Sequence, residues 1–314
     1  MPHRVLLLGV PRSGTTWLGQ ILGRAAGAAI VNEPDNPLLR RWVPVALGSN
    51  FEALPVVEPG DRAPHYERLW TYSFLGGGAG TLLRSARLKK RVDAWLQERP
   101  KVGRVLVESP AGPIVWSIRL AAAQARKPPR VVVVKSVFSA LAAEWVAVTF
   151  TPRVVWVKRH ALDVLASWMR MDFRPVPDPN DPWLQERVLP KIAAPPLEPG
   201  ASRTKQVAWA IGVQSVALEA AARSCGNWIE VTHEDLLANP VEQSQALFSR
   251  AGLEWSDSVD EYLAQSNQPG EGFDLKRVWG DLPGRWRREL SQEQIDDATS
   301  VLSAFPVEAI GSLD

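Results

Sequence analysis

The ten residues from Gly9 to Leu18, GVPRSGTTWL, constrain the fold of this chain more than any other stretch. They follow an apolar run, Val5 to Leu8, and open a second apolar segment from Trp17 to Leu22. This order predicts a buried strand, a tight turn and the start of a helix. A helix N-terminus binds anions, because its first N–H groups are unpaired and its dipole end is positive. The stretch therefore predicts an anion site at the end of a strand.

The two glycines have the spacing of a phosphate-binding loop, but the loop lacks one residue of that motif. Gly9 and Gly14 match G-x-x-x-x-G-K-[ST], in which the Lys reaches the β- and γ-phosphates. Thr15 stands at the Lys position, and a cation, Arg12, stands inside the loop instead. The loop is therefore typical of a site for an anion on a nucleotide, but not of ATP or GTP hydrolysis.

Strand-like and helix-like segments alternate after this loop. Short apolar runs predict strands at 4–8, 28–31, 102–107, 130–134, 153–157 and 227–232. Longer segments predict helices at 15–27, 82–97, 114–125, 139–148, 162–171, 205–223 and beyond 240. This order predicts an α/β fold resembling that of P-loop proteins, with three layers and helices on both faces of a central parallel sheet. Functional side chains are then expected at the carboxyl ends of the strands.

Two segments rich in proline or glycine interrupt the alternation. Residues 38–80 contain four prolines and three consecutive glycines, and residues 174–202 contain eight prolines. The second segment cannot form a regular helix or a central strand, because proline lacks the N–H donor. It is either a domain linker or a structured lid, and we favour the lid. We expect a single domain over residues 1–314, with both segments as insertions that shape the substrate site.

The charge balance and the cysteine count limit the kind of protein. The formal net charge is +2, and a nucleic-acid binder would carry a larger and clustered basic excess. The single cysteine, Cys225, forms no internal disulfide and is expected to be inert, which fits a reducing compartment. No stretch reaches about 18 apolar residues, and the apolar run at Val5 is too short for a signal peptide. We therefore expect a cytoplasmic protein with no stable membrane insertion.

The histidines and the tryptophans of the two insertions give weaker indications. The four histidines are scattered along the chain, so no metal site is expected, and His3 and His65 are expected at the surface. Trp42, Trp70 and Trp183 either pack in the core or line a substrate cleft.

A second constellation, RHALDVLAS, spans residues 159–167. Arg159 lies at the end of an expected strand, and Ser167 lies two turns into the helix that follows. Both can reach one phosphate, the Arg through a charged fork and the Ser through its hydroxyl. Alternatively, Arg159 caps a helix or pairs with Asp163.

Taken together, these residues resemble the nucleotide-dependent sulfotransferases, which use 3′-phosphoadenosine 5′-phosphosulfate (PAPS). The loop from Gly9 to Leu18 resembles their 5′-phosphosulfate loop, and its P-R-S-G-T-T form is similar to that of tyrosylprotein and bacterial members. Arg159 and Ser167 match the family's 3′-phosphate pair. His233 to Leu236 resembles its Y-E-D-L segment, and Gly284 to Arg287 resembles its C-terminal G-x-W-[KR] loop.

This resemblance implies a reaction and a set of binding residues. PAPS would be the donor and 3′,5′-adenosine bisphosphate (PAP) the product, with no metal and with a hydroxyl of a small molecule, lipid or glycan as acceptor. A homodimer is among the expected assemblies. The implied nucleotide-binding residues are Pro11, Arg12, Ser13, Gly14, Thr15, Thr16, Trp17, Arg159, Ser167, His233, Arg277, Gly284 and Arg285.

The resemblance also implies where the catalytic base lies. Cytosolic members carry their base His two residues after a Lys that matches Lys135, but Val137 stands there and cannot take a proton. Tyrosylprotein and carbohydrate sulfotransferases place a catalytic Glu about 21 residues after the basic residue of the loop, which is Glu33 in this chain. Glu108 is the second candidate for the base. Arg12, with help from Lys135, would stabilise charge on the leaving phosphate.

One departure from the tyrosylprotein members bears on the acceptor, and two other functions stay open. Asp35 stands where those members have a basic residue, which argues against a tyrosine-peptide acceptor. A P-loop kinase or NTPase would need a Lys at Thr15 and an acidic strand end for Mg²⁺. A non-catalytic nucleotide-binding module would explain the Val at position 137.

Overall fold

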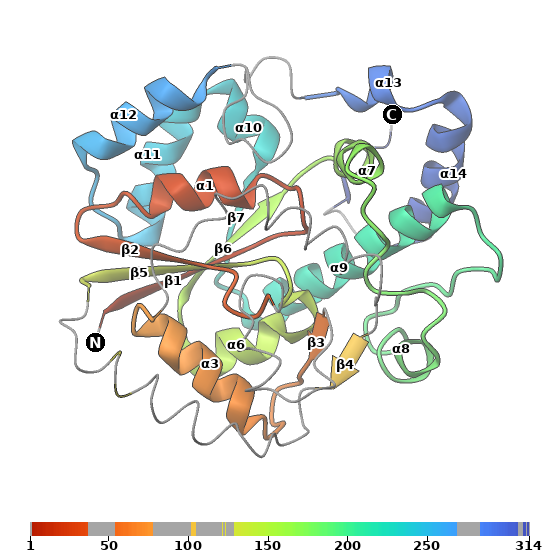
Figure 1. Ribbon diagram of the computed structural model, residues 1–314, viewed down its shortest axis with the longest axis horizontal. Helices are drawn as coiled ribbons and strands as arrows, with labels where there is room; N and C mark the ends of the chain where they lie inside the picture. Colours follow the sequence, from red (N-terminus) through yellow and green to blue (C-terminus); the bar gives the residue numbers. More distant parts are fainter. Residues whose placement is uncertain are drawn as a thin grey trace.

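A five-stranded parallel sheet forms the centre of the protein in the computed structural model (Figure 1). The structure describes residues 2–36, 54–77, 102–104, 121, 123, 129–268, 283–306, 310, 311 and 313. The strands are β1 (His3–Leu8), β2 (Ala28–Asn32), β5 (Val131–Ser136), β6 (Arg153–Lys158) and β7 (Ile229–Thr232), in the order β2-β5-β1-β6-β7. Every neighbouring pair is parallel. The predicted α/β fold with a central parallel sheet is confirmed.

Helices cover both faces of this sheet (Figure 1). One face carries α1 (Thr15–Leu22), α10 (His233–Ala238), α11 (Pro240–Ala251) and α12 (Asp257–Ser266). The other carries α3 (Pro64–Phe74), α6 (Ala143–Phe150) and α9 (Arg203–Cys225). Successive side chains of a strand point to opposite faces. Val5 and Leu7 of β1 therefore join the first core, whereas Leu6 and Leu8 join the second.

Several further elements complete the described fold. These are a 3-10 turn, η1 (Ala140–Ala142), and the helices α7 (Ala161–Arg170), α8 (Pro182–Arg187), α13 (Trp286–Glu289) and α14 (Gln292–Leu302). Strands β3 (Leu54–Val56) and β4 (Val102–Arg104) form a separate parallel pair. Of the strand expected at 102–107, the structure describes residues 102–104, which form β4 and pair with β3 rather than with the central sheet.

Hydrogen bonds tie the proline-rich segment 174–202 to the long helix α9. The indole of Trp209 donates to the carbonyl of Pro195 at 2.7 Å, and the amide of Gln214 donates to the carbonyl of Val176 at 2.7 Å. The segment also contains the short helix α8, which the prolines were expected to exclude. Proline is tolerated in the first turn of a helix, where its missing N–H would have no partner, and Pro182 is the first residue of α8.

Three further expectations can be compared with the structure. His65 is buried with 4% exposure, although it was expected at the surface, because it lies on the inner face of α3. Trp70 is fully buried and belongs to the core. Among the described helices, none is long and apolar enough to cross a membrane. The helices expected at 82–97 and most of 114–125, the residues Trp42, Glu108 and Arg277, and the side chain of Trp183 lie outside the described part.

Candidate active site

The carboxyl ends of the five central strands bring the predicted site residues to one edge of the sheet. β1 leads into the glycine loop, β2 into Glu33, β6 into Arg159 and β7 into His233, while Lys135 lies near the end of β5. Because β1 lies between β5 and β6, the loop stands at the middle of this edge. Ligands of parallel α/β sheets bind at such an edge.

Left-handed backbone at two positions shapes the glycine loop. Gly14 has φ +94°, and a Cβ there would overlap the ring of His233, so the position requires glycine. Arg12 has φ +76°, a conformation that costs a non-glycine residue about 1–2 kcal/mol. Two long-range bonds hold this part of the loop. The indole of Trp168 donates to the carbonyl of Pro11 at 2.8 Å, and Arg159 donates to the carbonyl of Arg12 at 2.9 Å.

Arg12 connects Ser167 and Arg159 at the loop. Nε of Arg12 donates to the hydroxyl of Ser167 at 3.0 Å, and Arg159 reaches the backbone of Arg12. Burial lowers the pKa of Arg159, while nearby Asp163 and Glu234 act in the opposite direction. A guanidinium nevertheless stays charged in proteins. The structure thus places two cations and a hydroxyl beside a helix N-terminus, a combination suited to phosphate.

His233 contributes a neutral ring to the same place. Burial, and secondly the charge of Arg159, lower the pKa of His233 well below 6.5. The imidazole packs against Gly14, at the start of α1. It therefore offers an uncharged polar edge next to the loop.

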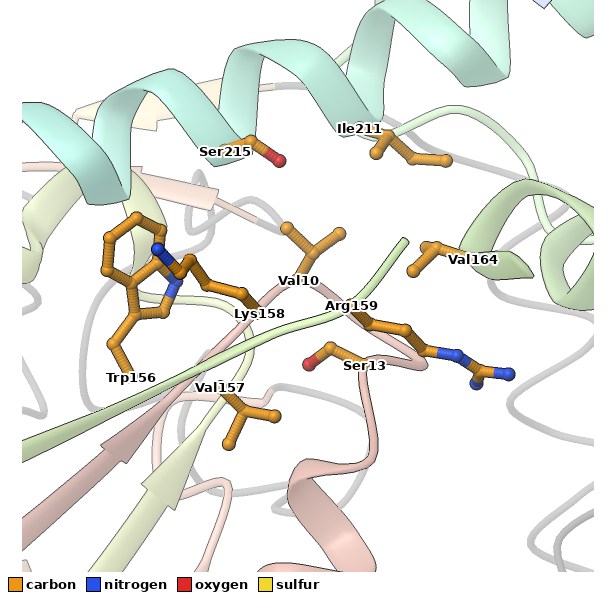
Figure 2. A pocket seen from close by; sticks show the side chains of 9 residues that line it. All are labelled: Val10, Ser13, Trp156, Val157, Lys158, Arg159, Val164, Ile211 and Ser215. Atoms are coloured by element: carbon orange, nitrogen blue, oxygen red, sulfur yellow. The ribbon is translucent and has the colours of Figure 1, made fainter. Parts of the chain in front are cut away.

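A small cavity lies between the loop, β6, α7 and α9 (Figure 2). It is lined by Val10, Ser13, Trp156, Val157, Lys158, Arg159, Val164, Ile211 and Ser215, and its volume of about 10 Å³ holds about one water molecule. Within the described part of the chain, Oγ of Ser13 and Nε of Arg159 are buried and have no hydrogen-bond partner. Buried polar atoms usually have partners, so these two donors fit a site whose ligand supplies acceptors.

The C-terminal loop docks on α7 through one buried carboxylate. Asp163 accepts the N–H of Gly284 at 3.0 Å and the N–H of Trp286 at 3.1 Å. The ring of Trp286 stacks on His160 with the centroids 5.5 Å apart and an interplanar angle of 9°. The N–H of His160 in turn donates to Glu234 at 3.1 Å. The motif at 159–167 therefore contacts both of the other motifs, at 233–236 and at 284–287.

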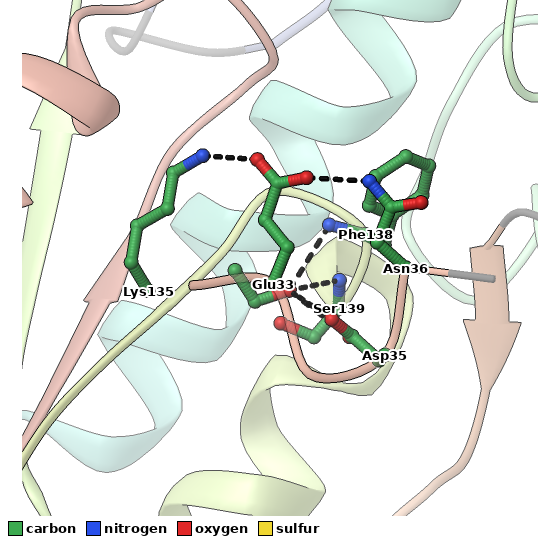
Figure 3. A network of polar contacts seen from close by, with 7 residues as sticks. Glu33, Asp35, Asn36, Lys135, Phe138 and Ser139 are labelled. Atoms are coloured by element: carbon green, nitrogen blue, oxygen red, sulfur yellow. Dashed lines mark hydrogen bonds and ion pairs between the residues drawn. The ribbon is translucent and has the colours of Figure 1, made fainter. Parts of the chain in front are cut away.

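Glu33 forms an ion pair with Lys135 at the other side of the loop (Figure 3). The ammonium of Lys135 donates to one carboxylate oxygen of Glu33, and the side-chain amide of Asn36 donates to the other at 2.5 Å. The N–H of Glu33 also donates to the carbonyl of Lys135 at 2.6 Å. Glu33 has φ +44°, again in the left-handed region. Both oxygens of the candidate base are therefore oriented by neighbours from β5 and from its own turn.

Asp35 and Asp163 were not singled out from the sequence as site residues, although both organise this edge. Asp35 is fully buried and accepts hydrogen bonds from Ser136 and Tyr66. Burial raises the pKa of Asp35 to about 6, against the lowering effect of the Ser136 bond. Burial, and secondly the charge of Asp35, raise the pKa of Tyr66 well above 10. Tyr66 is thus a neutral donor to the carboxylate.

Some predicted residues are not part of these contacts. Arg285 is half-exposed and forms an ion pair with Glu289. Trp17 is buried, and its indole donates to Ser266 of α12 at 3.2 Å. Arg277 and Glu108 lie outside the described residues. Within the described ranges, no group of three or more His, Cys, Asp or Glu side chains is arranged to hold a metal.

The chain has an α/β fold with a glycine-containing turn after its first strand, and this turn leads into a helix N-terminus, a place suited to anions. The model of the sulfotransferase family matches residues 3–257, and the chain therefore belongs to the sulfotransferase family. Sulfotransferases are transferases that move a sulfuryl group, and this is the class of reaction to which the site belongs. No curated protein matches the chain.

Several solved structures are similar to the chain. A sulfotransferase domain from the curacin biosynthetic pathway is 13% identical, with 96% of this chain and 98% of that chain covered and a TM-score of 0.48. Mouse sulfotransferase SULT7A1, complexed with PAP, is 10% identical, with 96% and 85% covered and a TM-score of 0.43. Retinol dehydratase, in complex with androsterone and inactive cofactor PAP, is 12% identical, with 96% and 79% covered and a TM-score of 0.37.

Proposed function

We propose that the protein transfers a sulfuryl group from PAPS to a hydroxyl of a small-molecule, lipid or glycan acceptor, with Glu33 as the general base. One observation supports this most strongly. The candidate base Glu33 and the candidate phosphate ligands Arg12, Arg159 and Ser167 lie at the same edge of the sheet. Glu33 and Lys135 lie at the ends of β2 and β5, on one side of the glycine loop. Arg159 lies at the end of β6, on the other side. Transfer between two bound substrates needs that arrangement, because their reacting atoms must meet at the loop.

The residues around the loop fit the two phosphate groups of such a donor. Arg159 and Ser167 would hold the 3′-phosphate, and the N–H groups of the loop with Arg12 would hold the 5′-phosphosulfate. The partnerless Oγ of Ser13 and Nε of Arg159 support this assignment, because they are donors in a buried site. When bound, PAPS supplies an activated sulfuryl group on a phosphate leaving group. His233 would lie beside the base of the nucleotide as a neutral ring.

Each charged residue then has a separate task. The carboxylate of Glu33 accepts the proton of the acceptor hydroxyl, a contribution that is typically worth about 10²–10⁴-fold in rate. Arg12 stabilises the negative charge that develops on the leaving phosphate, and it cannot donate a proton because guanidinium stays charged. Lys135 orients Glu33 and is the candidate proton donor to the leaving group.

The direct test is to incubate the protein with PAPS and a panel of hydroxyl acceptors and to measure release of PAP. In Glu33→Gln we expect turnover to fall by about 10²–10⁴-fold, while affinity for PAP stays unchanged, because the amide cannot accept the proton. Glu254→Gln is the matched control, since Glu254 is exposed and lies after α11. Unchanged turnover in Glu33→Gln would remove Glu33 as the base, and binding of ATP but not of PAP would exclude a PAPS-dependent enzyme.

A further inference from the structure

We propose that Asp35 is a positioning residue, a buried carboxylate that locks the Glu33 turn to the end of β5 and to α3 and so fixes the Glu33–Lys135 pair. This proposal deepens the proposed function and rests on it, because the pair matters only if Glu33 accepts a proton there. Asp35 is 0% exposed, so it cannot itself touch an acceptor.

The contacts of Asp35 join three elements, which are its own turn after β2, the strand β5 and the helix α3. The hydroxyl of Ser136, in β5, donates to the two oxygens of Asp35 at 2.8 and 3.0 Å. The hydroxyl of Tyr66, in α3, donates to Oδ2 of Asp35 at 3.3 Å. Ser136 also accepts the N–H groups of Phe138 and Ser139, at 3.1 and 3.2 Å. The lone pairs of the Ser136 hydroxyl are used by these two N–H groups, so its hydrogen points to the carboxylate. Ser136 is therefore the donor in its bond to Asp35.

The Asp35 contacts and the Glu33–Lys135 pair join the same two elements, the turn after β2 and the end of β5. Glu33 and Asp35 lie on one turn, and their partners Lys135 and Ser136 are consecutive residues of β5. Any shift of the turn along β5 would change both bonds together. Glu33 also has φ +44°, and a non-glycine residue keeps such a conformation only where its surroundings enforce it. The Asp35–Ser136 bond lies two residues further along and supplies that constraint.

The chemistry of the buried site favours a positioning role over a role in stability. A buried carboxylate is costly to ionise, and a neutral residue of the same shape would avoid that cost. An ionised Asp35 can only accept hydrogen bonds. Both of its oxygens accept from the Ser136 hydroxyl, and Oδ2 also accepts from the Tyr66 hydroxyl. Asparagine has the same shape, but its amide nitrogen would replace one of the two oxygens on which the Ser136 hydroxyl converges. That nitrogen is a donor, and the lone pairs of Ser136 are already used by the N–H groups of Phe138 and Ser139. Asp35→Asn therefore breaks the geometry while it removes the buried charge.

The test combines kinetics with stability. For Asp35→Asn we expect kcat to fall by about 10²-fold, with an unchanged affinity for PAP and an unchanged or higher Tm. Ser136→Ala should lower kcat to a similar extent, and the double variant should be no worse than either single variant, because both changes remove one link. Tyr66→Phe, which removes only the longer bond, is the control and should have a smaller effect.

Hydrogen exchange of the peptide that contains Glu33 and Asn36 gives a readout without turnover. We expect exchange there to be about tenfold faster in Asp35→Asn than in the wild type, because the turn opens more often. Three results would each overturn the proposal. The first is an exchange rate in Asp35→Asn equal to that of the wild type, and the second is a wild-type kcat in Asp35→Asn while Glu33→Gln is inactive. The third is a lowered Tm in Asp35→Asn, which would explain its loss of kcat by general destabilisation. Equal turnover in wild type and Glu33→Gln would instead overturn the assignment of the base and leave the exchange result to decide on Asp35.

Discussion

At the scale of single residues, two acidic side chains of one turn have opposite surroundings. Glu33 meets the ammonium of Lys135 and remains partly accessible, whereas Asp35 is buried and accepts hydrogen bonds from the hydroxyls of Ser136 and Tyr66. Environments that differ in this way give neighbouring carboxylates different tasks. For Asp35 the dominant effect is desolvation, which raises its pKa from 3.8 to about 6.

This raised pKa predicts a pH-dependent stability. A carboxyl whose pKa is higher in the folded state contributes stability below its unfolded pKa, 3.8, and loses that contribution as the pH rises through about 6. The whole contribution is on the order of 3 kcal/mol. The wild type loses about half of this contribution between pH 5 and pH 7.5. Asp35→Asn removes the contribution, so the Tm of the variant relative to wild type should rise by about 2 °C over that pH range. Thermal unfolding at a series of pH values measures this.

Asp257→Asn serves as the control for this measurement, because Asp257 is exposed in the first turn of α12. Its Tm difference from the wild type should be almost the same at both pH values. A Tm difference for Asp35→Asn that does not change with pH would mean that Asp35 has no raised pKa.

The sequence indicated the residues whose partners are local or belong to a motif, and it missed those whose partners are remote. Arg12, Arg159 and Ser167 could be named because their motifs resemble those of the sulfotransferases. In the structure Arg12 contacts Ser167 through its side chain and Arg159 through its backbone carbonyl. Asp35 has no such signal, since its role depends on the pairing of β2 with β5, which puts its turn beside Ser136. Asp163 similarly needs the distant loop at Gly284.

At the scale of elements, the turn from β6 into α7 organises the nucleotide side of the site. It carries Arg159 and His160 at its start and Ser167 two turns later, and Asp163 lies between them on the buried face. Asp163 connects α7 to the loop at 284–286 through two backbone N–H groups. The C-terminal loop is therefore held by the same helix that carries the proposed 3′-phosphate ligand Ser167.

Removal of this carboxylate should release the C-terminal loop. In Asp163→Ala the N–H groups of Gly284 and Trp286 lose their acceptor, and each unsatisfied buried group costs about 1–3 kcal/mol. The loop should then leave α7, and we expect affinity for PAP to fall by about tenfold or more. Isothermal titration calorimetry measures the change. Asp296→Ala, at an exposed position of α14, is the control, and equal PAP affinity in both variants would contradict this role of Asp163.

Elements with long apolar runs were predictable, and elements defined by their partners were not. The four consecutive valines of β5 predict a buried central strand, because a parallel strand is apolar on both faces. β4 has three residues, and nothing local distinguishes a strand of the main sheet from a partner of β3. The eight prolines of 174–202 argue against a helix there, but α8 forms because a helix start tolerates proline and Pro182 is its first residue.

At the scale of the whole molecule, one sheet separates two apolar cores, and the candidate site residues lie at the carboxyl ends of its strands. α1, α10, α11 and α12 build one core, and α3, α6 and α9 belong to the other (Figure 1). The single domain over 1–314, the homodimer and the cytoplasmic location stay predictions.

A nucleotide at the carboxyl edge of the sheet would contact the ends of β1, β6 and β7. These strands belong to different parts of the chain, so nucleotide binding should stabilise the molecule as a unit.

PAP should therefore raise the Tm of the protein, and it should do so through its 3′-phosphate. A ligand at 100 times its Kd adds about 2.7 kcal/mol to the stability of the folded state, which corresponds to several degrees in Tm. Adenosine 5′-monophosphate is the matched ligand, because it lacks only the phosphate assigned to Arg159 and Ser167, and at equal concentration its shift should be much smaller. Ser167→Ala, which removes one donor to that phosphate, should narrow the difference between the two nucleotides. Equal shifts by both nucleotides on the wild type would mean that Arg159 and Ser167 bind no 3′-phosphate, since every other contact to the two ligands would be shared.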